Sequence, residues 1–274
     1  MIHEKNMAVE KFAGYKATLG ACLDRISAGS VLKRRKLIII KPNLVNTSPF
    51  PVTTSPDMIS ALVKYIRKHS KARLIIAEGC GDAHLDTDQV FHRLGFLDLA
   101  AEHGLELVDL NQELLTMLRN PQCTVLPRIY MPRIALKGFL ISVPVLKMHS
   151  LAGVTLAMKN MLGLAPPKYY QQGGSWKKSF FHGQMHKSIF ELNLYRKPDL
   201  SIIDATVGMA EYHLGGRTCD PPVNKIVAGF DPVRVDAYGA ELLGFPWQDI
   251  PHIRMAHGVL GRAYGNQHSL NKII

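Results

Sequence analysis

The sequence predicts an α/β fold: a three-layer sandwich with a mainly parallel sheet. Four short runs of apolar residues, many of them β-branched, do not alternate with polar residues, which is typical of strands buried on both faces. The runs cover 37–40, 74–77, 139–146 and 200–203. Helical patterns separate them, and strands that alternate with helices favour a parallel sheet between two layers of helices. We expect residues 1–274 to form a single domain of this kind.

In the first half of the chain, an amphipathic pattern predicts a helix over 9–26, followed by the strand at 37–40. Ser55 as N-cap and Pro56 at the first helical position predict a helix that ends near His69. The patterns then predict a strand over 73–77, helical structure over 86–103, a strand over 105–109, and loops with short edge strands over 112–136.

In the second half, the strand at 139–146 is followed by a predicted helix over 154–162. Residues 165–183 are rich in glycine and paired aromatic or polar residues, and we expect them to form a mobile loop. The remaining patterns predict a helix over 184–195, a strand that ends at Asp204, a strand over 225–228, and a helix capped by Asp231.

The chain carries a formal charge of +11. This charge favours anionic partners: phosphorylated or carboxylated metabolites, nucleotides, nucleic acid or a membrane surface. Its four cysteines, Cys22, Cys80, Cys123 and Cys219, have no CxxC or ligand-like spacing, which favours a reducing, cytoplasmic compartment. No apolar segment reaches the length of a membrane span, and the first ten residues lack the apolar stretch of a signal peptide. We therefore expect no membrane association; a homo-oligomer is compatible with the sequence.

Polar side chains follow the apolar runs at the points where the predicted strands end. Lys41, Glu78, Lys147 and Asp204 stand at these positions. Because ligands of open α/β sheets bind beyond the carboxyl ends of the strands, these distant residues are predicted to meet at one pocket.

The segment from Lys147 to Asn160 is the strongest candidate for catalysis. Lys147 and His149 point the same way if the strand continues, and Thr155 and Lys159 share one face of the predicted helix. The rest of that helix is apolar nearly all round, so Lys159 and Asn160 have few solvated positions available. We predict Lys147, His149 and Lys159 as catalytic residues, with His149 as acid/base.

The turns after the first two strands supply the other predicted substrate-binding residues. Pro42 restricts the backbone at Lys41, and Asn43 follows. Glu78 precedes a glycine-rich turn, where it could serve as a base, orient a lysine or cap the turn. We predict Lys41, Asn43, Glu78, Thr155 and Asn160 as substrate-binding residues; a simple strand-to-loop turn is the alternative for Lys41.

A divalent metal is a second expectation. His182 and His186 are four residues apart and can chelate a metal on a helix, with His149 or Glu211 completing the site. Asp204 is a further metal-ligand candidate, so we name His186 and Asp204 as predicted metal ligands. Two solvent-facing histidines are the alternative reading, because Gly183 weakens the helix.

Lysines and aromatic residues interleave over 168–181. This mixture suits single-stranded nucleic acid, whose bases stack on aromatic rings. It suits a lid that closes over substrate equally well. We favour the lid because the segment lies between candidate site residues.

Several stretches, taken in order, resemble the family catalogued as domain of unknown function 362. They are Lys41-Pro-Asn43, Glu78-Gly79, the segment Pro144–His149, Thr155 with Lys159–Gly163, His186 before 197–200, Asp204, and 229–236 leading to 242–244. The likeness spans about 37–245 and implies an α/β domain without a settled reaction. Many relatives look fused to a ferredoxin-like iron–sulfur module, which implies redox work or a separate ferredoxin-type partner. This chain lacks that module, so no intrinsic iron–sulfur cluster is expected, and the family's turn glutamate is either shifted to Glu211 or lost.

Together these observations predict a cytoplasmic enzyme that uses lysine and histidine acid/base or electrophilic chemistry, with a metal as an option, on a small anionic substrate. A nucleotide- or nucleic-acid-binding module is the main alternative, and a redox partner of a ferredoxin-type protein is the weaker one.

Overall fold

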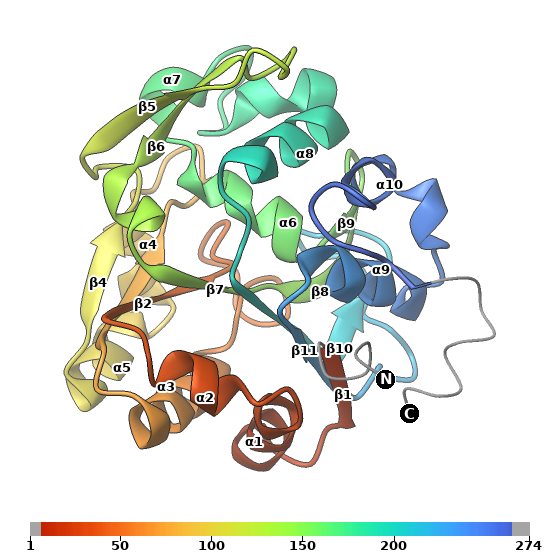
Figure 1. The fold of residues 1–274 in the computed structure, drawn as a ribbon. Coiled ribbons are helices and arrows are strands. Elements are labelled where there is room, and N and C mark those ends of the chain that lie inside the picture. The colour runs from red at the N-terminus through yellow and green to blue at the C-terminus, as the bar shows by residue number, and fades with distance from the viewer. Residues whose placement is uncertain (1–6, 265–274) are drawn as a thin grey trace.

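The computed structural model describes residues 7–264, and its centre is a mostly parallel sheet (Figure 1). The strand order is β1-β11-β10-β7-β2-β3-β4, and β8 and β9 extend the sheet beside β10. These strands are β1 (Met7–Lys11), β2 (Leu37–Pro42), β3 (Arg73–Glu78), β4 (Glu106–Asp109), β7 (Phe139–Val143), β8 (Val145–His149), β9 (Gly153–Thr155), β10 (Leu200–Met209) and β11 (Lys225–Gly229). The predicted α/β class is confirmed.

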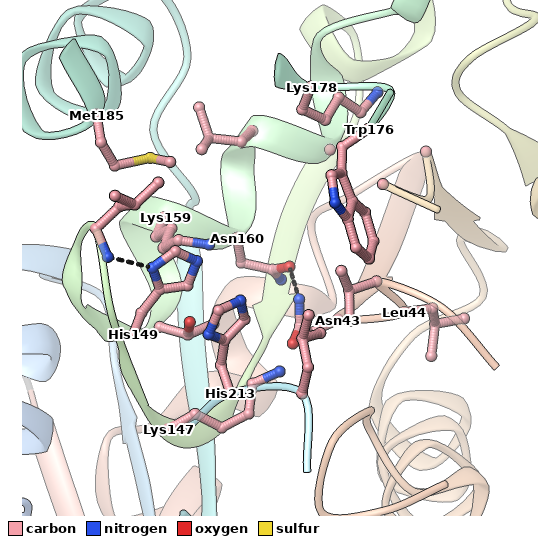
Figure 2. A pocket seen from close by; sticks show the side chains of 18 of the residues that line it. Asn43, Leu44, Lys147, His149, Lys159, Asn160, Trp176, Lys178, Met185 and His213 are labelled. Carbon is pink, nitrogen blue, oxygen red and sulfur yellow. Dashed lines mark hydrogen bonds between the residues drawn. The ribbon is translucent and has the colours of Figure 1, made fainter. Parts of the chain in front are cut away.

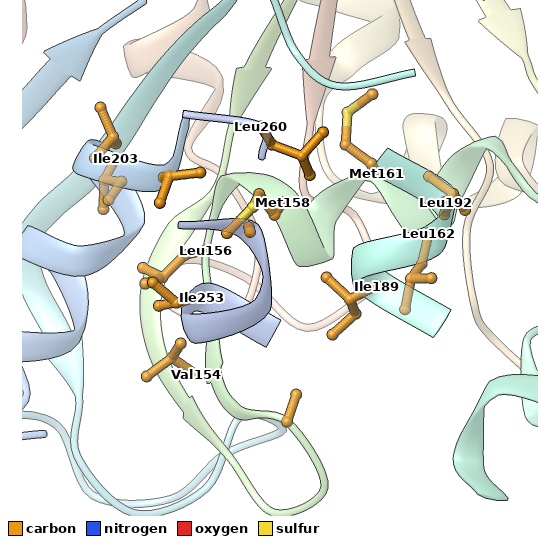
Figure 3. Packing of buried hydrophobic residues seen from close by; sticks show 14 of the residues in the cluster. Val154, Leu156, Met158, Met161, Leu162, Ile189, Leu192, Ile203, Ile253 and Leu260 are labelled. Carbon is orange, nitrogen blue, oxygen red and sulfur yellow. The ribbon is translucent and has the colours of Figure 1, made fainter. Parts of the chain in front are cut away.

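Helices cover both faces of the sheet, as Figure 1 shows. On one face lie α1 (Tyr15–Arg25), α2 (Ala28–Leu32), α3 (Pro56–His69), α4 (Thr87–Arg93) and α5 (Phe96–His103). On the other lie α6 (Ala157–Asn160), α8 (Met185–Tyr195), α9 (Pro232–Leu242) and α10 (Pro251–Ala256). Ile38 and Ile40 of β2 pack into the first core and Ile39 into the second, because successive side chains of a strand face opposite sides. Figure 3 shows the second core.

Smaller elements complete the fold. The antiparallel pair β5 (Leu115–Arg119) and β6 (Arg128–Pro132) lies within the predicted region of short strands, and α7 (Pro167–Tyr170) follows later. The 3-10 helices are η2 (Arg133–Leu136), η3 (Met161–Leu164), η4 (Ser179–Gln184) and η5 (Trp247–Asp249).

The first predicted helix begins too early. Residues Met7–Lys11 form β1, which pairs antiparallel with β11, and α1 starts only at Tyr15. Gly14 separates the two elements with a φ of 94°, a left-handed conformation that glycine adopts without strain. Edge pairing therefore overrides the helical periodicity of residues 9–12. Similarly, Gly95 (φ 78°) divides the helical region 86–103 into α4 and α5.

The predicted strand 139–146 is two strands with Pro144 between them. β7 pairs with β2 and β10, whereas β8 pairs with β10 and turns back onto β9. Because Val154 and Thr155 are β-branched, they suit this antiparallel pairing, and the predicted helix 154–162 shrinks to α6 followed by η3. Thr155 and Lys159 consequently do not share a helix face, contrary to the prediction.

A further prediction needs correction. The strand predicted to end at Asp204 continues to Met209, so Asp204 lies in the middle of β10. The segment 165–183 contains α7 and most of η4, and the Lys177 amide donates to the Gly81 carbonyl (3.1 Å); its mobility stays a prediction. Within residues 7–264, no helix combines the length and the apolar character that a membrane span requires.

Candidate functional site

A pocket of about 270 Å³ opens beyond the carboxyl ends of β2 and β3 and beside the β8–β9 hairpin (Figure 2). Eight residues predicted from sequence line it: Lys41, Asn43, Glu78, Lys147, His149, Thr155, Lys159 and Asn160. They come from four strands, one short helix and one loop. The structure therefore brings into one pocket the residues that the sequence analysis predicts as catalytic or substrate-binding, which are spread over 120 positions (41 to 160).

The β8–β9 hairpin sets one wall of the pocket. Lys147 and Thr155 are directly opposite each other in the antiparallel register, and His149 lies two residues along the same strand. Side chains at these positions share one face of the sheet. Lys147 and Thr155 are almost fully buried, and the Thr155 hydroxyl is a buried group without a hydrogen-bond partner in the described structure. A ligand hydrogen bond would satisfy it.

The opposite wall is a saturated hydrogen-bond network around Lys41. Its ammonium donates to Glu78 Oε1 (2.7 Å), Asn160 Oδ1 (3.0 Å) and the Pro42 carbonyl (3.3 Å). Glu78 also accepts from the backbone N–H of Leu44 (3.0 Å) and of Gly79 (2.8 Å). An ammonium has three donors, so Lys41 has none left for a substrate. The role that fits Lys41 and Glu78 is structural support rather than anion binding or general base.

This network also fixes the orientation of two amides. Because the Lys41 ammonium can only donate, the Asn160 atom beside it must be the oxygen. That oxygen also accepts from Asn43 Nδ2 (3.3 Å), so Asn43 Oδ1 points elsewhere, and it is buried without a partner (Figure 2). Asn160 Nδ2 donates to the Ser142 hydroxyl (3.0 Å) and to the Lys41 carbonyl (3.3 Å), so both of its N–H groups are engaged. Asn43 is therefore better placed than Asn160 to contact a ligand.

Gly163 allows the ion pair to pack this closely. A Cβ atom added to Gly163 would lie 2.6 Å from Lys41 Nζ, closer than any unstrained contact. The backbone of η3 thus covers the ion pair. Any side chain at position 163 would collide with it, which explains the glycine in the sequence Asn160-Met-Leu-Gly163.

Four lysines and one carboxylate, Glu78, are among the described residues of the lining. Burial, and then the nearby Lys159 ammonium, lower the pKa of Lys147 to about 7. Burial and the Lys41 charge lower the pKa of Lys159 to about 8, and burial lowers that of Lys178 to about 7 against the opposing effect of Glu78. Lysines with such pKa values can exchange protons near neutral pH, and an anion bound between them would favour their charged forms.

Lys147 and Lys159 keep donors available. The Lys147 ammonium donates one hydrogen bond, to the Val52 carbonyl (2.5 Å). Lys159 makes no hydrogen bond to any residue between 7 and 264 through its ammonium group. These two side chains, unlike Lys41, are therefore equipped to bind an anion.

His149 is held as a neutral ring. Its Nδ1 accepts from the backbone N–H of Leu151 (3.1 Å) and of Ala152 (3.2 Å), so the proton of the neutral ring is on Nε2. Burial, then Lys159 and His213, lower the pKa of His149 far below its usual range. The expected role as acid/base is therefore unsupported, and His149 is suited to donate a hydrogen bond to a ligand from Nε2.

A carboxylate outside the pocket positions α6. Asp236, fully buried on α9, accepts from the backbone N–H of Ala157 (2.8 Å) and of Met158 (2.9 Å). These are the first residues of the short helix that carries Lys159 and Asn160. Burial raises the pKa of Asp236 to about 7, despite the two N–H donors that oppose the shift. The sequence provided no pairing signal for this contact, because 79 positions separate Asp236 from Ala157.

The sequence did not single out several lining residues. Lys178 reaches Asn111 Oδ1 (2.5 Å) and the Ala165 carbonyl, and His213 stacks on His149 with 3.7 Å between ring centroids. Burial and nearby lysines lower the pKa of His213 to about 3. The only sequence signal for Lys178 was its place in the basic–aromatic segment 168–181, and the only one for His213 was its place near Glu211, where the family's turn glutamate is shifted or lost. Glu211 does not line the pocket; it is exposed and bonded to Arg217 Nε (2.6 Å).

The predicted metal ligands do not converge. His186 Nδ1 lies 3.0 Å from His252 Nδ1, and Asp204 accepts from the Tyr15 hydroxyl (2.7 Å) and the Thr206 hydroxyl (2.7 Å). Neither lines the pocket, and over residues 7–264 no three His, Cys, Asp or Glu side chains form a metal-binding group. Lysines that face the pocket also disfavour a divalent cation there. The residues present do not fit the predicted metal site.

The basic–aromatic segment is engaged with the protein itself. Lys177 donates to the Asp82 and Leu85 carbonyls (2.7 Å each), and Tyr169 stacks on Tyr130 at 3.8 Å. Trp176 lines the pocket, where its indole lies across from His149 and His213 (Figure 2). This placement is that of a cover over the pocket. Binding of nucleic acid and binding of a ferredoxin-type protein stay predictions.

Comparisons with known proteins identify the family and one solved structure of similar fold. A family model described as "Domain of unknown function (DUF362)" matches residues 38–241. Comparison with curated proteins gave no match. Among solved structures, the chain is similar to the lactate racemase apoprotein from Thermoanaerobacterium thermosaccharolyticum, with a TM-score of 0.53 and 14% sequence identity. The alignment covers 91% of this chain and 59% of the racemase, so the chain spans about three fifths of that protein, and the likeness concerns the fold.

Proposed function

The chain belongs to the DUF362 family, and from this premise we propose that it is an enzyme that binds a small anionic substrate and moves a proton with Lys147. The observation that carries the proposal is the pair of available lysines with lowered pKa values. Lys147, with a pKa of about 7, and Lys159, with a pKa of about 8, line a pocket that holds a single described carboxylate.

The two lysines are assigned different tasks. At pH 7 most Lys159 side chains carry their charge, so Lys159 attracts the anionic group of the substrate. About half of the Lys147 side chains are neutral at that pH, and a neutral amine can accept a proton. When Lys147 removes a proton from the substrate, its nitrogen becomes an ammonium, and the electron pair stays on the substrate. The charged neighbours and the donor at His149 Nε2 stabilise that negative charge.

The shared fold supplies supporting analogy only. The racemase is named for a reaction on lactate, a small 2-hydroxy carboxylate, and its structure is that of the apoprotein, the protein without its cofactor. A carboxylate of that size fits a pocket of about 270 Å³. An anionic cofactor would meet the same lysines, which suit it better than they suit a bare cation.

Proton exchange with solvent tests the proposal directly. The protein is incubated in D2O with a panel of small hydroxy, oxo and unsubstituted carboxylates, lactate included, and with simple phosphate esters; proton NMR follows each C–H signal. We expect at least one anion to lose a C–H signal with the wild type and to keep it with Lys147→Met. Lys71→Met, which removes an exposed lysine, is the matched control and keeps wild-type exchange. If no anion exchanges a proton or raises the Tm of the wild type, the proposal is wrong.

A further inference from the structure

The pocket has an apolar part that the proposed proton transfer does not use. Trp176, Leu162, Met185, Leu151, Tyr212 and Leu214 line it together with the lysines. Met185 and Leu162 are buried, and Figure 2 shows Met185 and Trp176 on the side of the pocket away from Lys147. Apolar walls that enclose a polar end are typical of sites for ligands with both characters.

Two of the lining side chains are exposed in a way that large apolar residues usually avoid. Leu151 is 44% exposed and Tyr212 is 45% exposed. They belong to the loops after β8 and β10, and the stacked rings of His149 and His213, their neighbours in sequence, join these loops. Because both side chains line the pocket and are also partly exposed to solvent, a ligand that extends out of the pocket can cover them.

The size of the cavity limits what fits inside. A carboxylate or phosphate group bound by Lys147 and Lys159 has only about three to five non-hydrogen atoms and occupies a small part of a cavity of about 270 Å³. The remainder of a longer ligand would pass the mouth and contact Leu151 and Tyr212.

We infer that the ligand of this pocket is an amphipathic anion: a carboxylate or phosphate whose aliphatic or aromatic body lies along Trp176 and leaves the pocket between Leu151 and Tyr212. The inference rests on the proposed function for its anionic end. It adds a substrate class, because acetate, lactate or inorganic phosphate alone would leave the apolar wall uncovered.

Calorimetric titration of matched ligand series tests this. The series are acetate, butyrate, hexanoate and 3-phenylpropionate, the corresponding alkyl phosphates, and the uncharged hexanol and 3-phenylpropanol. We expect affinity to rise about fourfold for each buried methylene, from the free energy of burying that group. The rise should be steeper in whichever of the two anionic series carries the natural group. The double variant Leu151→Ser with Tyr212→Ser should keep the affinity for the shortest anion and lose most of the rise.

The control is Leu97→Ser, which removes a leucine of similar exposure (46%) that does not line the pocket, and it should retain the full rise. Equal affinity for acetate and hexanoate would overturn the inference and leave the proposed function standing. Equal affinity for hexanol and hexanoate would instead show that the lysines do not recognise an anionic group, which would contradict the proposed function as well. If affinity rises with ligand length in the double variant as it does in the wild type, Leu151 and Tyr212 do not contact the ligand.

Discussion

Lys147 and Thr155 face each other across the β8–β9 hairpin, with one buried ammonium and one buried hydroxyl that lacks a partner. The pair exists because the chain reverses directly after His149. A lysine in this setting is costly to the fold, since burial opposes its charge. A buried residue that destabilises the fold is typical of a functional site. The free energy of unfolding of variants at Lys147 can therefore test its role.

Removal of the Lys147 charge should stabilise the fold. We expect Lys147→Met, which replaces the aliphatic stem of the side chain and removes the ammonium group, to raise the free energy of unfolding at pH 7 by on the order of 2 kcal/mol. The measurement is urea denaturation of the wild type, Lys147→Met and the surface control Lys71→Met. A variant less stable than the wild type would show that Lys147 supports the fold, through its bond to Val52.

The same lysine predicts the pH dependence of stability. Because the pKa of Lys147 falls from an ordinary 10.5 to about 7 on folding, the unfolded chain binds more protons than the folded chain between these pH values. The free energy of unfolding should therefore rise with pH in that window, and the rise should be smaller in Lys147→Met. Denaturation at pH 6.5, 8 and 9.5 measures the difference between the two proteins, and parallel curves would contradict the lowered pKa.

The rate of proton exchange should follow a bell-shaped pH profile. The rate rises as Lys147 loses its proton near pH 7, and it falls as Lys159 loses its charge near pH 8. The NMR exchange experiment repeated from pH 5 to 10 gives the profile. Lys159→Met should flatten the alkaline limb and lower the affinity for the anion; an unchanged alkaline limb would assign that limb to another group.

Asp236 should affect anion binding without any contact to the ligand. Asp236→Asn leaves one acceptor oxygen for two backbone donors, which should cost about 1–3 kcal/mol and loosen the helix that carries Lys159. We expect at least tenfold weaker anion binding. Glu191→Gln is the matched control, because Glu191 is a buried carboxylate that accepts from the N–H groups of Thr124, Val125 and Leu126 but does not line the pocket. Equal loss of anion affinity in both variants would reduce Asp236 to a general stabilising residue.

The Lys41–Glu78 ion pair should behave as support for the fold. Lys41→Met alone leaves a buried carboxylate without its charged partner and should cost about 3–5 kcal/mol, whereas Lys41→Met with Glu78→Gln should recover much of that loss. Thermal denaturation of both single variants and the double variant gives the coupling. Independent, additive losses would mean that the two side chains do not stabilise each other.

The sequence predicted the fold class and most of the pocket because both depend on strand signals. Buried apolar runs identify parallel strands, and the residues that follow them reach the same edge of the sheet, as Lys41, Glu78 and Lys147 do. The roles were harder to predict, because they depend on which hydrogen bonds a side chain has already made. Lys41 and Lys147 look alike in the sequence, yet one is saturated and the other is not.

The errors have local causes. Gly14 and Pro144 divide segments whose apolar pattern is continuous, and pairing with β8 converts residues 153–155 from helix to strand. Asp204 follows an apolar run in the same way as Lys41. Its strand, however, continues for five more residues, so Asp204 lies in the middle of the strand and does not line the pocket. Lys178 and His213 come from irregular segments, for which periodicity gives no position.

The lining runs from Lys41 to Leu214, so its walls are contributed by segments that span most of the chain. No shorter stretch of the polypeptide contains the whole lining, and the pocket exists only once the strands that carry it have come together in the sheet. A ligand that binds only the assembled pocket stabilises the native state by mass action. Its presence during refolding in vitro should therefore raise the yield of native protein.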